Sequence, residues 1–132
     1  MLSNTHMKQR ILVVDDEEPI RELLSTYFAG HEYEVTTAAT VPETVNSIQE
    51  TIPDLVILDI ALADADGLEL LGTLKASHPK LPIIILTGMG FDEELLQEAL
   101  QKGADGYVSK TLPLDQLLKE VMRTLKNKWT AT

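Results

Sequence analysis

Five polar side chains in this sequence each follow directly on a short, mainly apolar run. They are Asp15 and Asp16 after 11–14, Asp59 after 55–58, Thr87 after 83–86, and Lys110 after 107–109. An unbroken apolar run of this length indicates a strand that is buried on both faces, as in a parallel sheet. Ligands of open parallel sheets bind just beyond the carboxyl ends of the strands. We therefore expect the five side chains to gather at one edge of a sheet.

The carboxylates of Asp15, Asp16 and Asp59 would repel one another at such an edge. A cluster of this kind either raises its pKa values or recruits a cation. The ligands it offers are oxygen atoms, and no histidine or cysteine lies near them in the sequence. This donor set favours Mg²⁺, which keeps open coordination positions for water or phosphate when few protein groups bind it.

The same side chains supply the groups that phosphoryl transfer to a carboxylate requires, namely a nucleophile, a metal and donors for the phosphoryl oxygens. Asp59 can be the nucleophile because carboxylates form acyl phosphates. Thr87 can donate a hydrogen bond, and Lys110 can place a positive charge opposite the metal. Taken singly, these residues have ordinary explanations: a favourable charge at a helix N-terminus for Asp15 and Asp16, a structural hydroxyl and a solvated lysine. Only their expected proximity favours a site.

The elements that must position these groups alternate along the chain. Strand patterns lie at 11–14, 33–37, 55–58, 83–86 and 107–109. Between and after them come five apolar stripes at helical spacing: Ile20, Leu23, Leu24, Tyr27 and Phe28; Val41, Val45 and Ile48; Leu68, Leu71 and Leu74; Phe91, Leu95, Leu96 and Ala99; Leu114, Leu117, Leu118, Val121, Met122 and Leu125. This alternation predicts an α/β fold, a single doubly wound (βα)5 domain with helices on both faces of a parallel five-stranded sheet.

The strand patterns also predict the order of the sheet. The first, third and fourth strands are apolar throughout and belong in the middle, whereas 33–37 alternates in polarity and 107–109 is short, so these belong at the edges. The resulting order is 2-1-3-4-5, the flavodoxin-like arrangement. Its binding crevice falls between the first and third strands, where Asp15, Asp16 and Asp59 lie.

Composition narrows the class of protein. The chain has 132 residues, a formal net charge of −10 and no cysteine. Such an acidic chain repels phosphate backbones, so we expect no direct nucleic-acid binding. No stretch has the length and apolarity of a membrane span or a signal peptide, which favours a cytoplasmic location. We expect one domain over 8–126, with flexible ends at 1–7 and 127–132.

Four motifs in register carry a resemblance to a known family. They are Asp15-Asp16-Glu17 after the first strand, Asp59 with Asp66-Gly67 following, Thr87-Gly88, and Lys110 preceded by Tyr107. From roughly Lys8 to Leu125 the chain resembles the receiver domain of bacterial two-component response regulators.

The resemblance implies roles for individual residues. Asp59 would be the phosphoacceptor, with a sensor histidine kinase or phosphotransfer protein as donor of the phosphoryl group. Asp16 and Asp59 would bind Mg²⁺ directly, Asp15 largely through water, and the backbone carbonyl of Ala61 would complete the protein ligands. The protein would not be an enzyme beyond catalysing its own phosphorylation and dephosphorylation.

The resemblance also implies a switch. Thr87 would move onto the phosphoryl group, Lys110 would bridge to it, and Tyr107 would turn inward as Thr87 moves. A downstream effector would bind the face formed by the fourth helix, fifth strand and fifth helix. Without the family, Tyr107 is equally well explained as a partly buried aromatic residue.

The chain departs in two respects from the pattern that the family shows. Thr111 follows Lys110 where proline is frequent, often after a cis bond; because a cis bond before a non-proline residue costs about 2.5–4 kcal/mol, we predict a trans bond. Ala61 and Met89 occupy positions that influence hydrolysis of the phosphoaspartate, and neither side chain can hydrogen-bond an attacking water. Slow hydrolysis is therefore expected.

Three alternative interpretations stay open at this stage. A flavin carrier on the same sheet would need a hydroxyl- or glycine-rich loop after the first strand, where this chain has Asp15-Asp16-Glu17-Glu18. An aspartate-nucleophile phosphatase would usually place a second aspartate two positions after the nucleophile, where this chain has Ala61. The chain could act as a stand-alone receiver, or be a receiver fragment of a larger transcriptional regulator or hybrid kinase.

Overall fold

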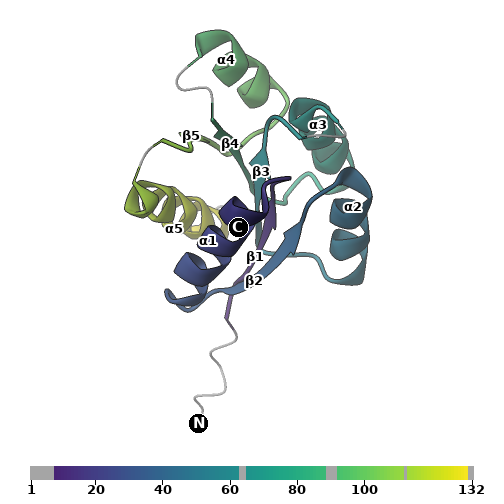
Figure 1. Cartoon of the computed structure of the whole chain (residues 1–132). Coiled ribbons are helices and arrows are strands. Elements are labelled where there is room, and N and C mark those ends of the chain that lie inside the picture. Colours follow the sequence, from purple (N-terminus) through teal and green to yellow (C-terminus); the bar gives the residue numbers. More distant parts are fainter. Residues whose placement is uncertain (1–7, 63–64, 89–91, 112, 131–132) are drawn as a thin grey trace.

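A parallel sheet of five strands forms the centre of the molecule (Figure 1). The computed structural model describes residues 8–62, 65–88, 92–111 and 113–130, with only the helical backbone at 128–130. The strands are β1 (Arg10–Val14), β2 (Glu34–Ala38), β3 (Leu55–Asp59), β4 (Ile83–Thr87) and β5 (Gly106–Ser109). Their spatial order is β2-β1-β3-β4-β5, which confirms the order expected from burial patterns.

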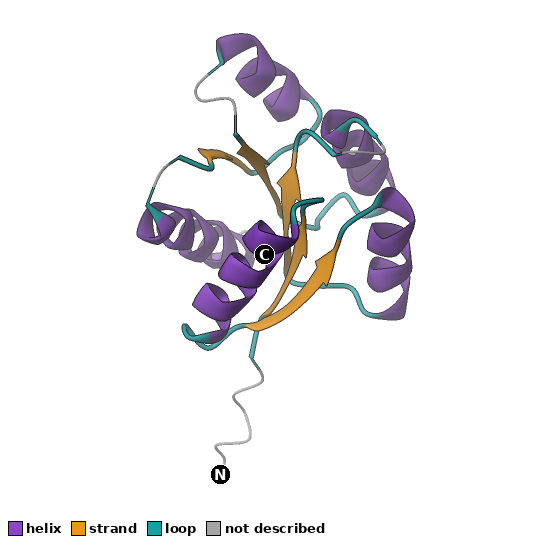
Figure 2. Cartoon of the chain, in the orientation of Figure 1, coloured by secondary structure: helices purple, strands orange, loops and turns teal. Residues whose placement is uncertain are grey.

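Helices cover both faces of the sheet, as Figure 2 shows. They are α1 (Glu18–Ala29), α2 (Val41–Glu50), α3 (Gly67–Ser77), α4 (Glu93–Gln101) and α5 (Leu114–Thr130). One apolar cluster packs α1 and α5 against one face, through Leu24, Phe28 and Val121 among others. A second packs α2, α3 and α4 against the other face, through Ile48, Leu71 and Ala99 among others. No helix within the described ranges is both long and apolar enough to cross a bilayer.

The predicted burial of the strands is confirmed. Every residue of β3 and β4 is buried, and so are the four residues 11–14 of β1. The edge strand β2 buries only Ala38 fully and exposes most of the rest, as its alternating pattern indicated. The central strands are therefore held on both faces, which gives the residues at their carboxyl ends a rigid support.

Two stripe residues are not where the sequence placed them. Leu23 of α1 is 49% exposed and Met122 of α5 is 54% exposed, so their predicted place in the apolar stripes is wrong. Both lie at the margin of a stripe whose centre, formed by residues such as Leu24 and Val121, faces the sheet. Phe91, assigned to the fourth stripe, lies outside the described residues. The helix α5 continues through Thr130, beyond the expected end of the domain at 126.

A capping pair begins α2, and a glycine follows the end of α4. Thr40 caps α2 by accepting a hydrogen bond from the Glu43 N–H (3.2 Å), while the Glu43 carboxylate accepts one from the Ala39 N–H (2.8 Å). This reciprocal pair is a capping box, reaching one residue further back than its usual form. Gly103 follows α4 with a φ of 101°, a left-handed conformation that glycine adopts without steric cost.

The start of α3 lies directly against the end of β3. The Gly67 N–H donates to the Ile60 carbonyl (2.9 Å), and Asp66 caps the helix by accepting from the Leu68 N–H (2.9 Å). A Cβ at position 67 would overlap the Asp59 carbonyl oxygen and lie 2.7 Å from Ile60 Cα. The glycine thus allows the start of α3 to lie directly beside the carboxyl end of β3.

Candidate functional site

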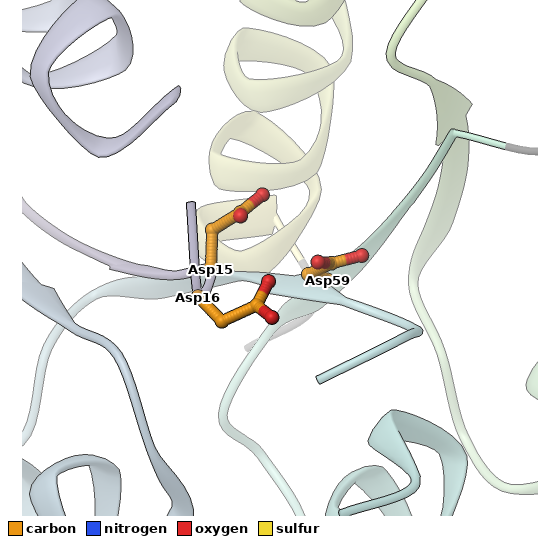
Figure 3. Close-up of side chains that lie close together, drawn as sticks. All are labelled: Asp15, Asp16 and Asp59. Carbon is orange, nitrogen blue, oxygen red and sulfur yellow. The ribbon is translucent and has the colours of Figure 1, made fainter. Parts of the chain in front are cut away.

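The register of the central strands brings three aspartates together. Val14 of β1 pairs with Leu58 of β3, so Asp15 and Asp59 follow at adjacent strand ends. Asp15, Asp16 and Asp59 each offer one carboxylate oxygen, and these oxygens lie within 4.8 Å of one another. Figure 3 shows the three side chains projecting from the neighbouring ends of β1 and β3. The predicted cluster is therefore present.

Asp15 is fully buried and is held on several sides. Its N–H donates to the Ala38 carbonyl (3.1 Å), which extends the pairing of β1 with β2. Its Oδ1 accepts from the Glu17 N–H (2.9 Å), and its carbonyl accepts from Arg21 Nη1 (2.8 Å). Its Oδ2 lies 2.9 Å from Lys110 Nζ, an ion pair without the angles of a hydrogen bond. The chain thus fixes this carboxylate before any ligand binds.

Asp59 is also buried, with 3% of its surface exposed. Its Oδ1 accepts from the Ala61 N–H (3.2 Å), and its Oδ2 accepts from Lys110 Nζ (3.3 Å). Burial raises the pKa of the Asp59 carboxyl above its usual range, and the charge of Asp15 adds to this. The hydrogen bond from Ala61 and the charge of Lys110 oppose the rise in pKa without cancelling it.

Lys110 is delivered by the pairing of β5 with β4. Ser109 pairs with Thr87, and the Lys110 N–H then donates to the Thr87 carbonyl (2.6 Å). The ammonium contacts Asp15 and Asp59 and a third carboxylate, that of Glu17 (3.2 Å). Burial lowers the pKa of Lys110, but the neighbouring carboxylates, Asp15 foremost, raise it by more, so the ammonium stays charged.

Thr87 and Tyr107 lie on adjacent strands beside this cluster. Thr87 is fully buried at the end of β4. The Tyr107 hydroxyl is buried near Thr87 without the geometry of a hydrogen bond, and the ring packs against the cluster that includes α4. Burial raises the pKa of Tyr107, the nearby Thr87 hydroxyl opposes this, and the charge of Asp92 adds to it. The two side chains named as a switch are thus neighbours.

The donors present fit a hard divalent cation. All three carboxylates offer oxygen, Asp16 is exposed to solvent, and Asp15 Oδ2 is a buried oxygen that no hydrogen bond satisfies. The positive charge of Lys110 lies beside that oxygen, as expected where a carboxylate cluster needs a counter-ion. For Ala61 the structure records the N–H toward Asp59, and the predicted use of its carbonyl as a ligand stays a prediction.

A contact of Glu17 was not predicted from the sequence. Glu17 appeared there only as part of an acidic motif after the first strand, yet its carboxylate accepts a hydrogen bond from Lys110. Its position next to Asp15-Asp16 was the available signal, but the reach of a glutamate side chain cannot be read from spacing. The Lys110–Thr111 bond is trans, as predicted, since the described residues contain no cis peptide bond. Met89, expected to influence hydrolysis, lies outside the described residues.

Comparison with known proteins agrees with this geometry. Residues 11–122 match the family model described as the response regulator receiver domain. The chain belongs to this family. Membership argues against the flavin-carrier and phosphatase interpretations, since it accounts for the whole set of strand-end residues on one fold.

Regulatory proteins of known name share the sequence of this receiver domain. The receiver domain described here is 35% identical over 117 residues to the regulatory protein AtoC of Escherichia coli, covering 89% of this chain and 25% of that protein. It is 35% identical to the phosphate regulon transcriptional regulatory protein PhoB of Klebsiella pneumoniae, covering 90% of this chain and 54% of that protein. The chain therefore spans about half or less of the length of these curated relatives.

Two solved structures superpose closely on the receiver. The CheY-like receiver domain protein of Methanospirillum hungatei has a TM-score of 0.88 at 30% identity, with 96% of this chain and 100% of that chain covered. The structure of NtrX from Brucella abortus has a TM-score of 0.88 at 34% identity, with 95% of this chain and 28% of that chain covered. The fold thus occurs both as a short chain and as part of a longer one.

Proposed function

We propose that this receiver accepts a phosphoryl group on Asp59 in a Mg²⁺-dependent reaction. The observation that carries the proposal is the placement of Asp59. Its buried carboxylate ends a central strand, with two further carboxylates on one side and an ammonium 3.3 Å away. Asp15, Asp16 and Asp59 would hold the metal, with the Ala61 carbonyl. The bound metal would neutralise charge on the phosphoryl oxygens and on Asp59.

The chain's own residues then account for the transfer step. A carboxylate oxygen of Asp59 forms a bond to phosphorus while the phosphorus–nitrogen bond of a phosphohistidine breaks, and the electron pair stays on the imidazole nitrogen. The Ala61 N–H holds the other oxygen of the carboxylate and so orients the nucleophile. Lys110 then faces the phosphoryl oxygens, and the Thr87 hydroxyl donates a hydrogen bond to one of them.

The donor in this proposal is a sensor histidine kinase or a phosphotransfer protein. Support comes from family membership, because receiver domains exchange phosphoryl groups with such partners. The net charge of −10 argues against direct nucleic-acid binding by this domain. Where a longer regulator contains it, the effector domain would supply the output; otherwise a separate protein would.

The first prediction concerns the covalent adduct. With Mg²⁺ and acetyl phosphate, the intact protein should gain the mass of one phosphoryl group, and hydroxylamine should remove it because acyl phosphates are labile to this nucleophile. Asp59→Asn should abolish the gain. Asp54→Asn, at the opposite end of β3, is the matched control and should retain it. A full mass gain in the Asp59→Asn protein would place the acceptor elsewhere.

The output face is the second prediction. We infer that an effector binds α4, β5 and α5, because Thr87 and Tyr107 connect the site to β5 and to the cluster containing α4. A partner must bind one conformer better than the other for phosphorylation to change its affinity. Amide chemical shifts should therefore change on α4 and β5 upon phosphorylation. Changes outside the site that are confined to α1 and α2 would contradict the proposed face.

A further inference from the structure

Glu17 joins the carboxylate cluster from the solvent side. Its Oε1 lies 3.2 Å from Lys110 Nζ, and its side chain is 59% exposed, whereas the side chains of Asp15 and Asp59 are almost completely buried. Lys110 thus has two inner partners, both expected metal ligands, and one outer partner that is not. The sequence motif and the proposed chemistry leave the role of this outer carboxylate undefined.

The backbone of Glu17 is fixed while its side chain is exposed. Its N–H donates to Asp15 Oδ1 (2.9 Å), and its carbonyl accepts from the N–H groups of Ile20 and Arg21 (both 3.1 Å). Glu17 is therefore the N-cap residue of α1, and no hydrogen bond from its side chain caps the helix. The carboxylate is free for another task, and its anchored backbone keeps it within reach of Lys110.

A divalent cation among the three aspartates would change the partners of Lys110. The cation and the ammonium are both positive and would compete for the oxygens of Asp15 and Asp59. Lys110 would then lose much of its interaction with these inner carboxylates. Glu17 could keep its contact, because it lies on the outer side of the ammonium and is not among the clustered ligands.

We propose that Glu17 is a positioning residue for Lys110, holding the ammonium at the rim of the site when a divalent cation occupies the aspartates. The inference rests on the proposed function, since it concerns the same metal site. Glu17 lowers the free-energy cost of displacing Lys110 and so raises the affinity for the metal. It also keeps the ammonium beside the site, where the incoming phosphoryl group needs it.

A double-mutant cycle separates this role from a simple effect of charge. Glu17→Gln removes one negative charge near the metal and also removes the outer partner of Lys110. Lys110→Met removes the ammonium and keeps much of the side-chain length. Glu18→Gln removes the same charge from the adjacent exposed position at the start of α1 and serves as the matched control. The Mg²⁺ dissociation constant of each protein, measured by calorimetry, is the readout.

The expected result is a coupling between Glu17 and Lys110. Glu17→Gln should weaken Mg²⁺ binding about three-fold, the size expected for one partly exposed ion pair. In the Lys110→Met background the same substitution should change the Mg²⁺ affinity by less than about 1.5-fold. Without Lys110, it acts only by removing a negative charge whose effect on the metal is screened by solvent. Glu18→Gln should bind Mg²⁺ as tightly as wild type. Glu17→Asp, which keeps the carboxylate, should weaken Mg²⁺ binding less than Glu17→Gln does. Equal weakening in both backgrounds, or none in either, overturns the inference.

Failure of this inference can be distinguished from failure of the proposed function. Wild-type protein is titrated with Mg²⁺ and phosphorylated with acetyl phosphate in parallel. If it neither binds the metal nor forms the adduct on Asp59, the proposed function fails and the inference falls with it. If both occur and the cycle shows no coupling, the proposed function stands and only the role of Glu17 is overturned. Thermal melts without metal verify that each variant is folded.

Discussion

At the scale of single residues, the Asp59 carboxyl gives stability a dependence on pH. Its folded pKa is raised above the usual 3.8, chiefly by burial. A carboxyl with a raised folded pKa favours folding in its protonated form, so that stability is lost as pH rises from the unfolded pKa to the folded one. The cost reaches about 1.4 kcal/mol for each unit by which the folded pKa exceeds the unfolded value.

Asp59→Asn should therefore become more stable than wild type as pH rises. Without metal, the difference in unfolding free energy should be smallest near pH ~3, below the unfolded pKa, grow as pH rises, and level off above the folded pKa. Urea denaturation in EDTA at a series of pH values up to neutrality measures this difference. The comparison near pH ~3 is the internal control, because the Asp59 carboxyl is then mostly protonated in both the folded and the unfolded state. A difference that stays constant or shrinks with pH would show that burial of the charged carboxylate is not the cause.

At this scale the positions of strand ends could be predicted from the sequence, and the contacts of long side chains could not. The sequence predicts which side chains lie at the ends of the strands, because each follows a mainly apolar run and backbone register alone brings strand ends together. These side chains include Asp15, Asp59, Thr87 and Lys110. The contact of Glu17 with Lys110 depends on rotamers of two long side chains, which residue spacing does not determine.

At the scale of elements, the approach of α3 to β3 depends on a single glycine. Gly67→Ala would force a Cβ into the backbone of Asp59 and Ile60, which pairing with β1 and β4 holds in place. We expect a loss of about 2 kcal/mol or more in unfolding free energy. At Gly72, within the same helix, a new Cβ would meet no atom within 4 Å beyond its own stretch of helix, so Gly72→Ala should gain about 0.5–1 kcal/mol in unfolding free energy.

Urea denaturation of the two alanine variants tests this argument, and each serves as control for the other. A neutral Gly67→Ala variant would show that the start of α3 can move away from Asp59 and Ile60 without cost. The Gly67→Ala protein should also bind Mg²⁺ more weakly, because the new Cβ would displace the backbone that carries Asp59 and Ala61.

Periodicity predicted the elements well and the margins of their faces poorly. The number, type and order of helices and strands followed from apolar patterns, because burial on one or two faces leaves a distinct period in sequence. The exposure of Leu23 and Met122 did not follow, since a helical stripe defines a face but not how far the sheet extends beneath it. Such margins are set by tertiary packing.

At the scale of the whole molecule, the strand order concentrates negative charge at one place on an already acidic protein. The order β2-β1-β3-β4-β5 brings the ends of β1 and β3 together, and the chain carries a net charge of −10. Any divalent cation would stabilise such a protein somewhat by screening its self-repulsion. A rise in melting temperature with Mg²⁺ is therefore insufficient evidence for a specific site.

Asp16→Asn separates specific binding from screening, because it removes one expected ligand and changes the total charge by a single unit. At a metal concentration ten times the dissociation constant, specific binding should add about 1.4 kcal/mol to wild-type stability. For a domain of this size the gain corresponds to a rise of roughly 5 °C in melting temperature. Asp16→Asn should lose most of this increment and keep the small part due to screening.

Thermal melts of both proteins in EDTA, in Mg²⁺, and in NaCl of matched ionic strength measure the two contributions. A variant that keeps the full response to Mg²⁺ would show that Asp16 is not a ligand, and that the stabilisation arises from the charge of the whole molecule rather than from the cluster.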